Sequence, residues 1–208
     1  MKKTFLLLTF CFCSALSAQK IATINMDKTF LDYYKTIAAE KKLKKQVRIM
    51  EDRAVEMEKR HKALIAEYQQ LLKDSASVII KESAREEKKA EAENKAAEIK
   101  RIEQTMRSFN KDARGMLAKQ HNDSRADILD EIKKVVEMIA KNKSAELVLD
   151  TSGKTSNLIS SVVYNKGSND ITEEVLSILN KGHEKEVEDY KKEKTAKSDA
   201  DKNDAEKK

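Results

Sequence analysis

The side chains best suited to chemistry are few in this chain and do not form a recognisable set. Its three histidines, His61, His121 and His183, lie far apart in the sequence, and its two cysteines, Cys11 and Cys13, both fall near the amino terminus. The phosphate-binding, hydrolase and zinc motifs G-x-x-x-x-G-K-[ST], G-x-G-x-x-G, G-x-S-x-G and H-E-x-x-H are absent from the sequence. We therefore expect no enzyme, no cofactor and no metal site.

Composition indicates which elements the chain is built from. Of its 208 residues, 38% are charged and only 5% are aromatic, with four glycines and no proline. Such a composition favours long helices over a compact, turn-rich domain. The many carboxylates have lysines four residues away, a pattern typical of the solvated face of a helix.

The central stretch, residues 35–142, carries apolar residues at coiled-coil spacing. In its first part the seam positions are separated alternately by four and three residues, which is a heptad pattern. They are Leu43, Val47, Met50, Ala54, Met57, His61, Leu64, Tyr68 and Leu71. A seam this narrow needs a partner helix along its length. His61 within it is either a tolerated polar residue or a pH-sensitive contact.

A second helix is predicted to begin near Ser83, because Ser83 and Glu86 form a capping box. Its seam runs through Ala92, Ala96, Ile99, Ile102, Met106, Phe109, Ala113 and Met116, and the apolar stripe fades over residues 118–127, where we expect looseness. The two helices form an antiparallel hairpin with its tip at about residues 74–82. Three apolar residues at the tip either contact a partner or fold back onto the helices; they are Val78, Ile79 and Ile80.

Both ends of the hairpin lead into predicted strands. These are residues 20–25, with β-branched side chains, residues 145–150, with a continuous apolar centre, and residues 158–165. A short helix from Asp170 follows, with Val175, Leu176 and Leu179 on one face. The fold class is thus mostly α with a small β body, formed by residues 19–34 and 143–182. A body of this size is marginally stable alone, and oligomerisation would cover its sheet.

The two ends of the chain have contrasting character. Residues 1–18 read as a signal peptide, with Lys2 and Lys3 before an apolar run and small residues near a cleavage site after Ser17 or Ala18. A lipid anchor is disfavoured because each cysteine follows a phenylalanine. Residues 183–208 form a charged tail that we expect to be disordered.

Net charge points to the kind of partner. The value of +6 for the whole chain falls to +4 once Lys2 and Lys3 are removed with the signal peptide. A mild positive field favours acidic chains or anionic lipids. Nucleic acid is disfavoured because no basic block is interleaved with aromatic residues.

The order of the segments resembles the Skp/OmpH family of periplasmic chaperones. The resemblance rests on KIATINMDKTFLDYYK at residues 20–35, ELVLD at 146–150 and VVYNKGSNDITEEVLSILN at 162–180. It implies a homotrimer in which helical hairpins surround a cavity that holds unfolded outer-membrane proteins in the periplasm without ATP. The residues that the resemblance places in the trimer body are Ile21, Ile24, Leu147, Leu149, Val162 and Tyr164. The tail after Gly182 has no counterpart in the family pattern.

The leading hypothesis from the sequence is therefore an ATP-independent periplasmic holdase for unfolded outer-membrane β-barrel proteins, which contacts clients through weak basic and apolar surfaces. Two alternatives stay open. One is an exported coiled-coil spacer or adaptor that binds a folded envelope partner, and the other is a protein that binds anionic lipid or lipopolysaccharide.

Overall fold

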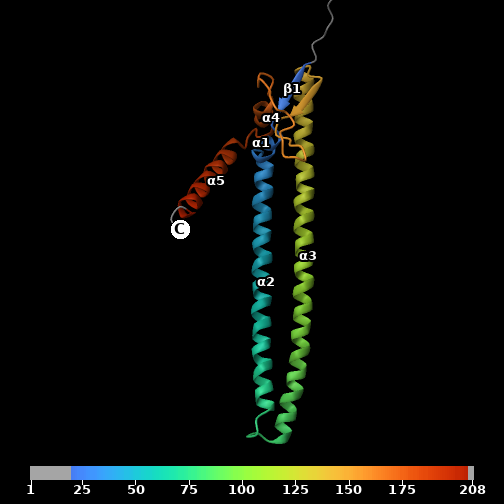
Figure 1. Ribbon diagram of the computed structural model, residues 1–208, viewed down its shortest axis with the longest axis vertical. Helices are drawn as coiled ribbons and strands as arrows, with labels where there is room; N and C mark the ends of the chain where they lie inside the picture. Colours follow the sequence, from blue (N-terminus) through green and yellow to red (C-terminus); the bar gives the residue numbers. More distant parts are fainter. Residues whose placement is uncertain (1–19, 206–208) are drawn as a thin grey trace, which may run out of the picture. The chain divides into compact units, whose positions relative to one another are not determined.

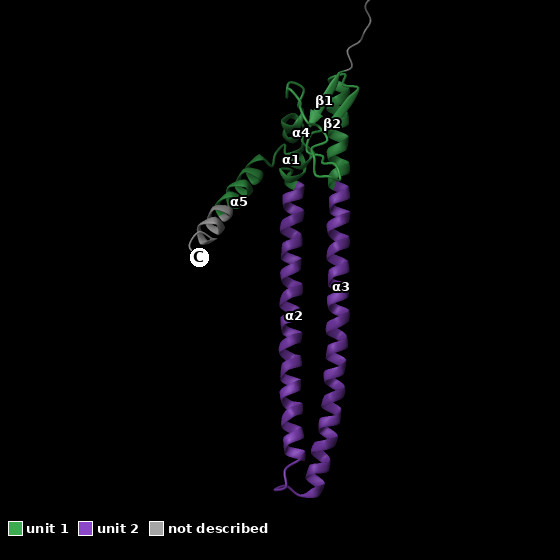
Figure 2. Ribbon diagram, in the orientation of Figure 1, with its two compact units in different colours: residues 1–34, 128–208 green, residues 35–127 purple. Residues whose placement is uncertain are grey.

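The computed structural model describes residues 20–205 and has the expected fold class, mostly helical with a small sheet (Figure 1). The predicted signal peptide, residues 1–18, lies outside the described residues. The elements in chain order are β1 (Ile21–Ile24), α1 (Met26–Leu31), α2 (Tyr34–Ser75), α3 (Glu82–Asn142), β2 (Leu147–Asp150), α4 (Thr172–Leu179) and α5 (Glu184–Ala205). The chain divides into two compact units (Figure 2): unit 1 comprises residues 1–34 and 128–208, and unit 2 comprises residues 35–127.

The sheet of unit 1 pairs the two strands that flank the hairpin. β1 and β2 are parallel, and Ile21 lies opposite Leu147 while Ile24 lies opposite Asp150. Residues 169–171 continue the pairing on the other edge of β1, where the Thr23 N–H donates to the Asn169 carbonyl and the Ile171 N–H donates to the Thr23 carbonyl. β1 is thus the central segment of unit 1, and segments distant in the sequence meet on it.

The third strand predicted at residues 158–165 does not form, and this prediction is wrong. The region instead folds as a turn closed by an isolated bridge between Lys154 and Ser160. Leu158 adopts a φ of 62°, in the left-handed region, which is incompatible with a strand. The apolar side chains of Val163 and Tyr164 are left 87% and 83% exposed.

Two segments with the sequence Asp-x-Ser/Thr, residues 150–152 and 170–172, accept hydrogen bonds from the backbone at the start of α1. The Asp150 carboxylate accepts from the Met26 N–H at 3.1 Å, and the Ser152 hydroxyl accepts from the Asp27 N–H at 3.0 Å. In the second segment, Thr172 Oγ1 accepts from the Asn25 N–H at 2.9 Å. Helix α1 itself is capped by Asn25, whose side-chain oxygen accepts from the Lys28 N–H at 2.8 Å. These bonds satisfy backbone donors that a helix start leaves without intrahelical partners.

The apolar core of unit 1 is formed by β1, Tyr33, the last turns of α3, the start and one face of α4, and the first turn of α5. Its buried apolar side chains are Ala22, Ile24, Tyr33, Ile128, Ile132, Ile139, Ile171, Val175, Leu176, Leu179 and Val187. The helix predicted around Val175, Leu176 and Leu179 is confirmed as α4, and these three side chains are its buried face. The core therefore combines segments that precede the hairpin in the sequence with segments that follow it.

The charged tail differs from the expectation of disorder. Residues 184–205 form α5, and its first turns contact the rest of unit 1 because Val187 is buried and Lys191 pairs with Asp32 at 2.7 Å. A low content of apolar residues disfavours independent folding, but a helix can be held by a few contacts to a body that is already folded.

Unit 2 is an antiparallel pair formed by α2 and the larger part of α3, as expected for the hairpin (Figure 1). All nine heptad positions from Leu43 to Leu71 are buried or half-buried. On α3, Ala96 and Met116 are exposed instead, and Leu117, Gln120 and Ser124 are half-buried. The buried stripe thus continues through residues 118–127 on polar side chains, and α3 is uninterrupted there; the looseness expected for that stretch stays a prediction.

The seam of unit 2 is thin. Its buried apolar side chains are Ile37, Leu64 and Ala92. Polar contacts also cross between the helices, because Lys95 pairs with Glu67 at 2.9 Å and His61 Nε2 lies 3.3 Å from Glu103 Oε1. The hairpin is therefore stabilised by many shallow contacts along its length rather than by a thick core.

Candidate functional site

The tip of the hairpin presents apolar side chains without cover. α2 ends at Ser75 and α3 begins at Glu82, one residue before the predicted cap Ser83. Val78 and Ile79 are 88% and 92% exposed, whereas Ile80 is half-buried. Of the two arrangements that the sequence left open, the structure has the exposed one for Val78 and Ile79. Two neighbouring branched apolar side chains at the tip are thus left almost fully exposed to solvent.

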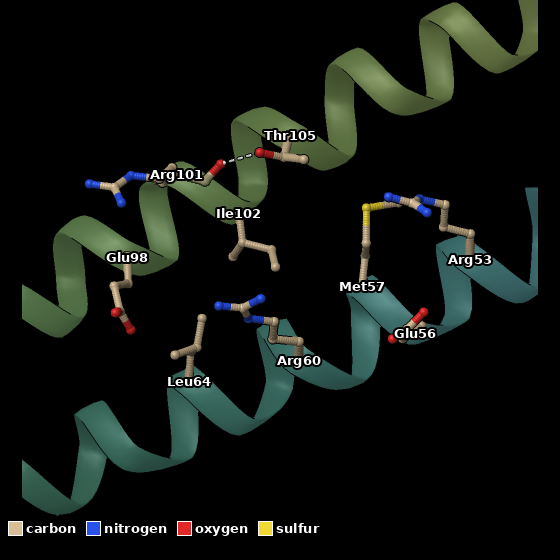
Figure 3. A pocket seen from close by; sticks show the side chains of 9 residues that line it. All are labelled: Arg53, Glu56, Met57, Arg60, Leu64, Glu98, Arg101, Ile102 and Thr105. Atoms are coloured by element: carbon tan, nitrogen blue, oxygen red, sulfur yellow. Dashed lines mark hydrogen bonds between the residues drawn. The ribbon is translucent and has the colours of Figure 1, made fainter.

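A groove of about 430 Å³ lies between α2 and α3 in unit 2 (Figure 3). Its apolar floor is formed by Met57, Leu64 and Ile102; Leu64 points from α2 toward α3, and Ile102 points back toward α2. Exposed charged residues form the rim, namely Arg53, Glu56, Arg60, Glu98 and Arg101. The groove is therefore a surface feature with an apolar base and ionic walls.

Positive charge dominates the rim. The structure shows no ion pair for Arg53, Arg60 or Arg101 with any described residue. Glu98, in contrast, lies 3.1 Å from Lys95, which also pairs with Glu67. Hydrogen bonds to Glu67 and Glu98 raise the pKa of Lys95 and keep it charged, so the charge of Glu98 is already compensated.

The groove can bind a group that is both anionic and apolar. A guanidinium offers five N–H donors in a planar arrangement that matches a carboxylate or a phosphate. Met57 adds an unbranched, polarisable side chain that adapts to different shapes. This combination suits short segments of an extended polypeptide in which acidic and apolar side chains alternate, and it requires no particular sequence.

The six residues predicted for the trimer body fall into two groups. Ile21, Leu147 and Leu149 lie on the paired strands and expose 39%, 49% and 36% of their surface. Ile24 is buried within its own chain, while Val162 and Tyr164 lie in the turn region rather than in a strand. The structure therefore brings the strand residues together but does not place Val162 and Tyr164 in the same sheet.

The side chains with potential for metal binding or acid–base chemistry are scattered over residues 20–205. Residues 20–205 contain no group of three or more His, Cys, Asp or Glu side chains close enough to hold a metal ion. The three histidines lie apart: His61 faces Glu103, His121 lies beside Asn122, and His183 stacks on Tyr34. Among the helices between residues 20 and 205, none combines the length and the apolar character needed to cross a bilayer.

The described residues thus combine a parallel strand pair, interrupted in the sequence by a long helical hairpin, with apolar side chains exposed at the tip and along the strands. The family model described as outer membrane protein (OmpH-like) matches residues 20–179. The chain belongs to the OmpH-like family, which is a chaperone family. No curated protein matches the chain significantly.

Sequence reasoning identified the tip but missed the groove. The heptad pattern had assigned Met57, Leu64 and Ile102 to the seam, and it treated the arginines as part of a solvated surface. A signal was present in the spacing of Arg53, Met57, Arg60 and Leu64, which alternates four, three and four residues and so places all four on one side of α2. Their convergence with Arg101 and Ile102 depends on the register between the helices, which one sequence does not specify.

Proposed function

We propose that this protein is an ATP-independent periplasmic holdase that binds unfolded outer-membrane β-barrel proteins and prevents their aggregation. In this proposal a signal peptide directs its export and is cleaved off near Ser17 or Ala18. The observation that carries the proposal is the surface of the hairpin, where Val78 and Ile79 are fully presented at the tip and an arginine-rimmed apolar groove lies between the helices. Membership of the OmpH-like family supports the same function.

Binding in this proposal consists of many weak contacts. Unfolded client segments place apolar side chains on Met57, Leu64 and Ile102, and their carboxylates against the arginines of the rim. Each exposed ion pair contributes only about 0.2 to 1 kcal/mol. Clients can therefore be bound at several positions and still be released without an energy source.

The proposal includes assembly into a homotrimer through unit 1. Ile21, Leu147 and Leu149 leave an apolar face of the small sheet exposed, and Val163 and Tyr164 add to the exposed apolar surface of the unit. Among the described residues β2 pairs only with β1, so its other edge is uncovered. An uncovered strand edge with apolar side chains is a site for pairing with another copy. A mass measurement by light scattering tests this directly: a trimer supports the proposed assembly, and a monomer at working concentration refutes it.

Aggregation on dilution tests the chaperone function. A urea-unfolded outer-membrane β-barrel protein is diluted into buffer with or without the mature chain, and light scattering is followed over time. We expect suppression at one trimer per client, and no suppression would refute the proposal. An adaptor would bind one folded partner and leave aggregation unchanged.

Two charge-matched triple variants test whether the arginines of the groove contact the client. Replacing all three rim arginines, as Arg53→Gln, Arg60→Gln and Arg101→Gln, should weaken client binding more than the charge-matched control Lys59→Gln, Lys100→Gln and Lys111→Gln. These three lysines are exposed and lie outside the groove. Equal losses in the two triple variants would show that net charge alone attracts clients. The anionic lipid alternative is tested with lipopolysaccharide in place of the client: it predicts an affinity for lipopolysaccharide that falls steeply with salt, and an affinity insensitive to salt would rule it out.

A further inference from the structure

The connection between α1 and α2 is a short break in the helical path, which we call the joint and which comprises Asp32, Tyr33 and Tyr34. Tyr33 is buried, and its hydroxyl donates to Glu131 Oε2 at 2.6 Å. The rings of Tyr33 and Tyr34 meet edge to face with centroids 5.1 Å apart. Since α2 begins at Tyr34, whatever fixes the joint also fixes the first turn of α2.

Asn180, at the carboxyl end of α4, bonds to the backbone of the joint on both sides of Tyr33. Its side-chain oxygen accepts from the Tyr34 N–H at 2.8 Å, and its side-chain nitrogen donates to the Asp32 carbonyl at 2.9 Å. The two partners in the latter bond are separated by 148 residues in the chain. A helix start has free N–H groups, and here a distant side chain satisfies one of them.

The residues that follow Asn180 add two more contacts to the joint and one buried side chain in α5. The ring of His183 stacks on Tyr34 with centroids 3.7 Å apart and planes 4° apart. Lys191 pairs with Asp32 at 2.7 Å, and Val187 is buried. The His183 N–H donates to the Asn180 carbonyl at 2.8 Å and so links the turn after α4 to α5.

The residues that contact the joint come after the segment that the family match covers, whereas the joint itself lies within that segment. The match ends at residue 179, whereas Asn180 and all the α5 residues named above come after it. The contacts are also weak one by one, because Lys191 is half exposed and a single ion pair of this kind contributes little. A segment held in this way can open locally without unfolding the unit it rests on.

We propose that residues 180–191 form a clamp that fastens the joint and the first turn of α2, and that release of this clamp loosens the joint. The tail is then a conformational device rather than an inert extension. The inference does not depend on which clients the hairpin binds, since every contact that supports it lies within unit 1.

Two truncations of the full chain test the clamp. The first ends after Gly182 and removes His183, Val187 and Lys191; the second ends after Ala196 and retains them. Hydrogen exchange by NMR is read at the Tyr34 amide, whose acceptor is Asn180. We expect exchange at this amide to be about tenfold faster in the shorter chain, which corresponds to about 1.4 kcal/mol of lost local stability. The chain ending after Ala196 should match the full chain.

Point variants in the full-length chain keep the test independent of truncation. Val187→Asp should undock α5 and speed exchange at Tyr34, and His183→Ala should do so more mildly. His183→Phe keeps a flat ring over Tyr34 and should restore slow exchange together with the ring-current shift of the Tyr34 protons. Amides of α4 around the buried Val175 should stay protected throughout, because they report on the core of unit 1.

The clamp proposal is wrong if truncation after Gly182 and Val187→Asp both leave hydrogen exchange at the Tyr34 amide as slow as it is in the full chain. It would also be overturned if truncation after Ala196 loosened the joint as much as truncation after Gly182. Failure of the holdase assay alone would leave these exchange measurements unaffected, so the two proposals can fail separately.

Discussion

The Asp150 carboxylate joins the end of β2 to the start of α1, and its removal should destabilise unit 1 by a predictable amount. Its Oδ1 accepts from the Met26 N–H at 3.1 Å, from the Ser152 N–H at 2.8 Å and from the Ser152 hydroxyl at 2.6 Å. Met26 lies 124 residues away in the sequence. We predict that Asp150→Ala lowers the free energy of unfolding, because it leaves these donors in a partly buried place without their acceptor.

The size of the effect follows from the number of bonds. A hydrogen bond contributes about 1 kcal/mol net, and one to a charged acceptor contributes about 1.5 to 3 kcal/mol. The Ser152 hydroxyl can rotate toward water, so the loss is mainly that of the two backbone donors. Because both bonds are only partly buried, each should count at the lower end of that range, and we expect about 3 kcal/mol for Asp150→Ala. Asp150→Asn keeps an oxygen acceptor in place and loses only the charge, so about 1 kcal/mol is expected.

Urea titration at one fixed protein concentration measures the change, because assembly would make stability depend on concentration. Tyrosine fluorescence reports on all five tyrosines, four of which lie in unit 1 and one, Tyr68, in unit 2, and far-ultraviolet circular dichroism reports on the helices. The control is Asp123→Ala, which removes an exposed carboxylate paired with Lys119 on α3 and should change stability by less than about 0.5 kcal/mol. The hydrogen-bond explanation is refuted if Asp150→Ala has the same free energy of unfolding as the control. It is also refuted if Asp150→Asn lowers the free energy of unfolding as much as Asp150→Ala does.

Three further changes test the cores of the two units. Ile132→Ala should cost about 2 to 5 kcal/mol in urea titration, because Ile132 is completely buried and its loss leaves a cavity. Ala92→Leu should cost about 1 to 3 kcal/mol, because Ala92 is buried where α3 packs against α2 and a larger side chain forces the helices apart. Burial, followed by the bond to Glu131, raises the pKa of Tyr33. The unfolded chain then ionises first, and stability falls as pH rises above about 10; Tyr33→Phe should make this fall shallower, as measured by thermal unfolding.

The spacing of apolar residues was enough to predict the hairpin. All nine positions from Leu43 to Leu71 are inward-facing because one helix face repeats close to every seven residues. The prediction failed later in α3, where Leu117 is half-buried in place of Met116. An α-helix drifts relative to a strict heptad repeat, so an assignment carried forward over many turns selects the neighbouring residue.

The strands were predicted in part. Residues 147–150 pair with β1, but residues 158–165 do not, although both segments are rich in branched apolar residues. The other edge of β1 is taken by Asn169, Asp170 and Ile171, which show no strand pattern. Their placement depends on where α4 packs and on the bonds of Thr172, and neither is encoded in local propensity.

The groove and the clamp share a reason for being missed. Both are formed by side chains from segments far apart in the sequence, such as Arg60 with Arg101 and Tyr34 with His183. Each residue alone is an ordinary exposed polar or aromatic residue. Only the register of the two helices and the docking of α5 bring them together, and those depend on tertiary packing.

The parallel pairing of β1 with β2 has a consequence for the order in which the chain can fold. β1 is among the first segments to be made, yet its two neighbours, β2 and residues 169–171, come only after the whole hairpin. Closing such a long loop directly is entropically costly, whereas the hairpin forms from local contacts and returns residue 127 to the end of unit 2 where residue 35 lies. We therefore expect the helical hairpin to form first. Its formation shortens the effective loop between β1 and β2 before the two strands pair. Until that moment the apolar strand β1 is itself an unfolded segment in need of protection.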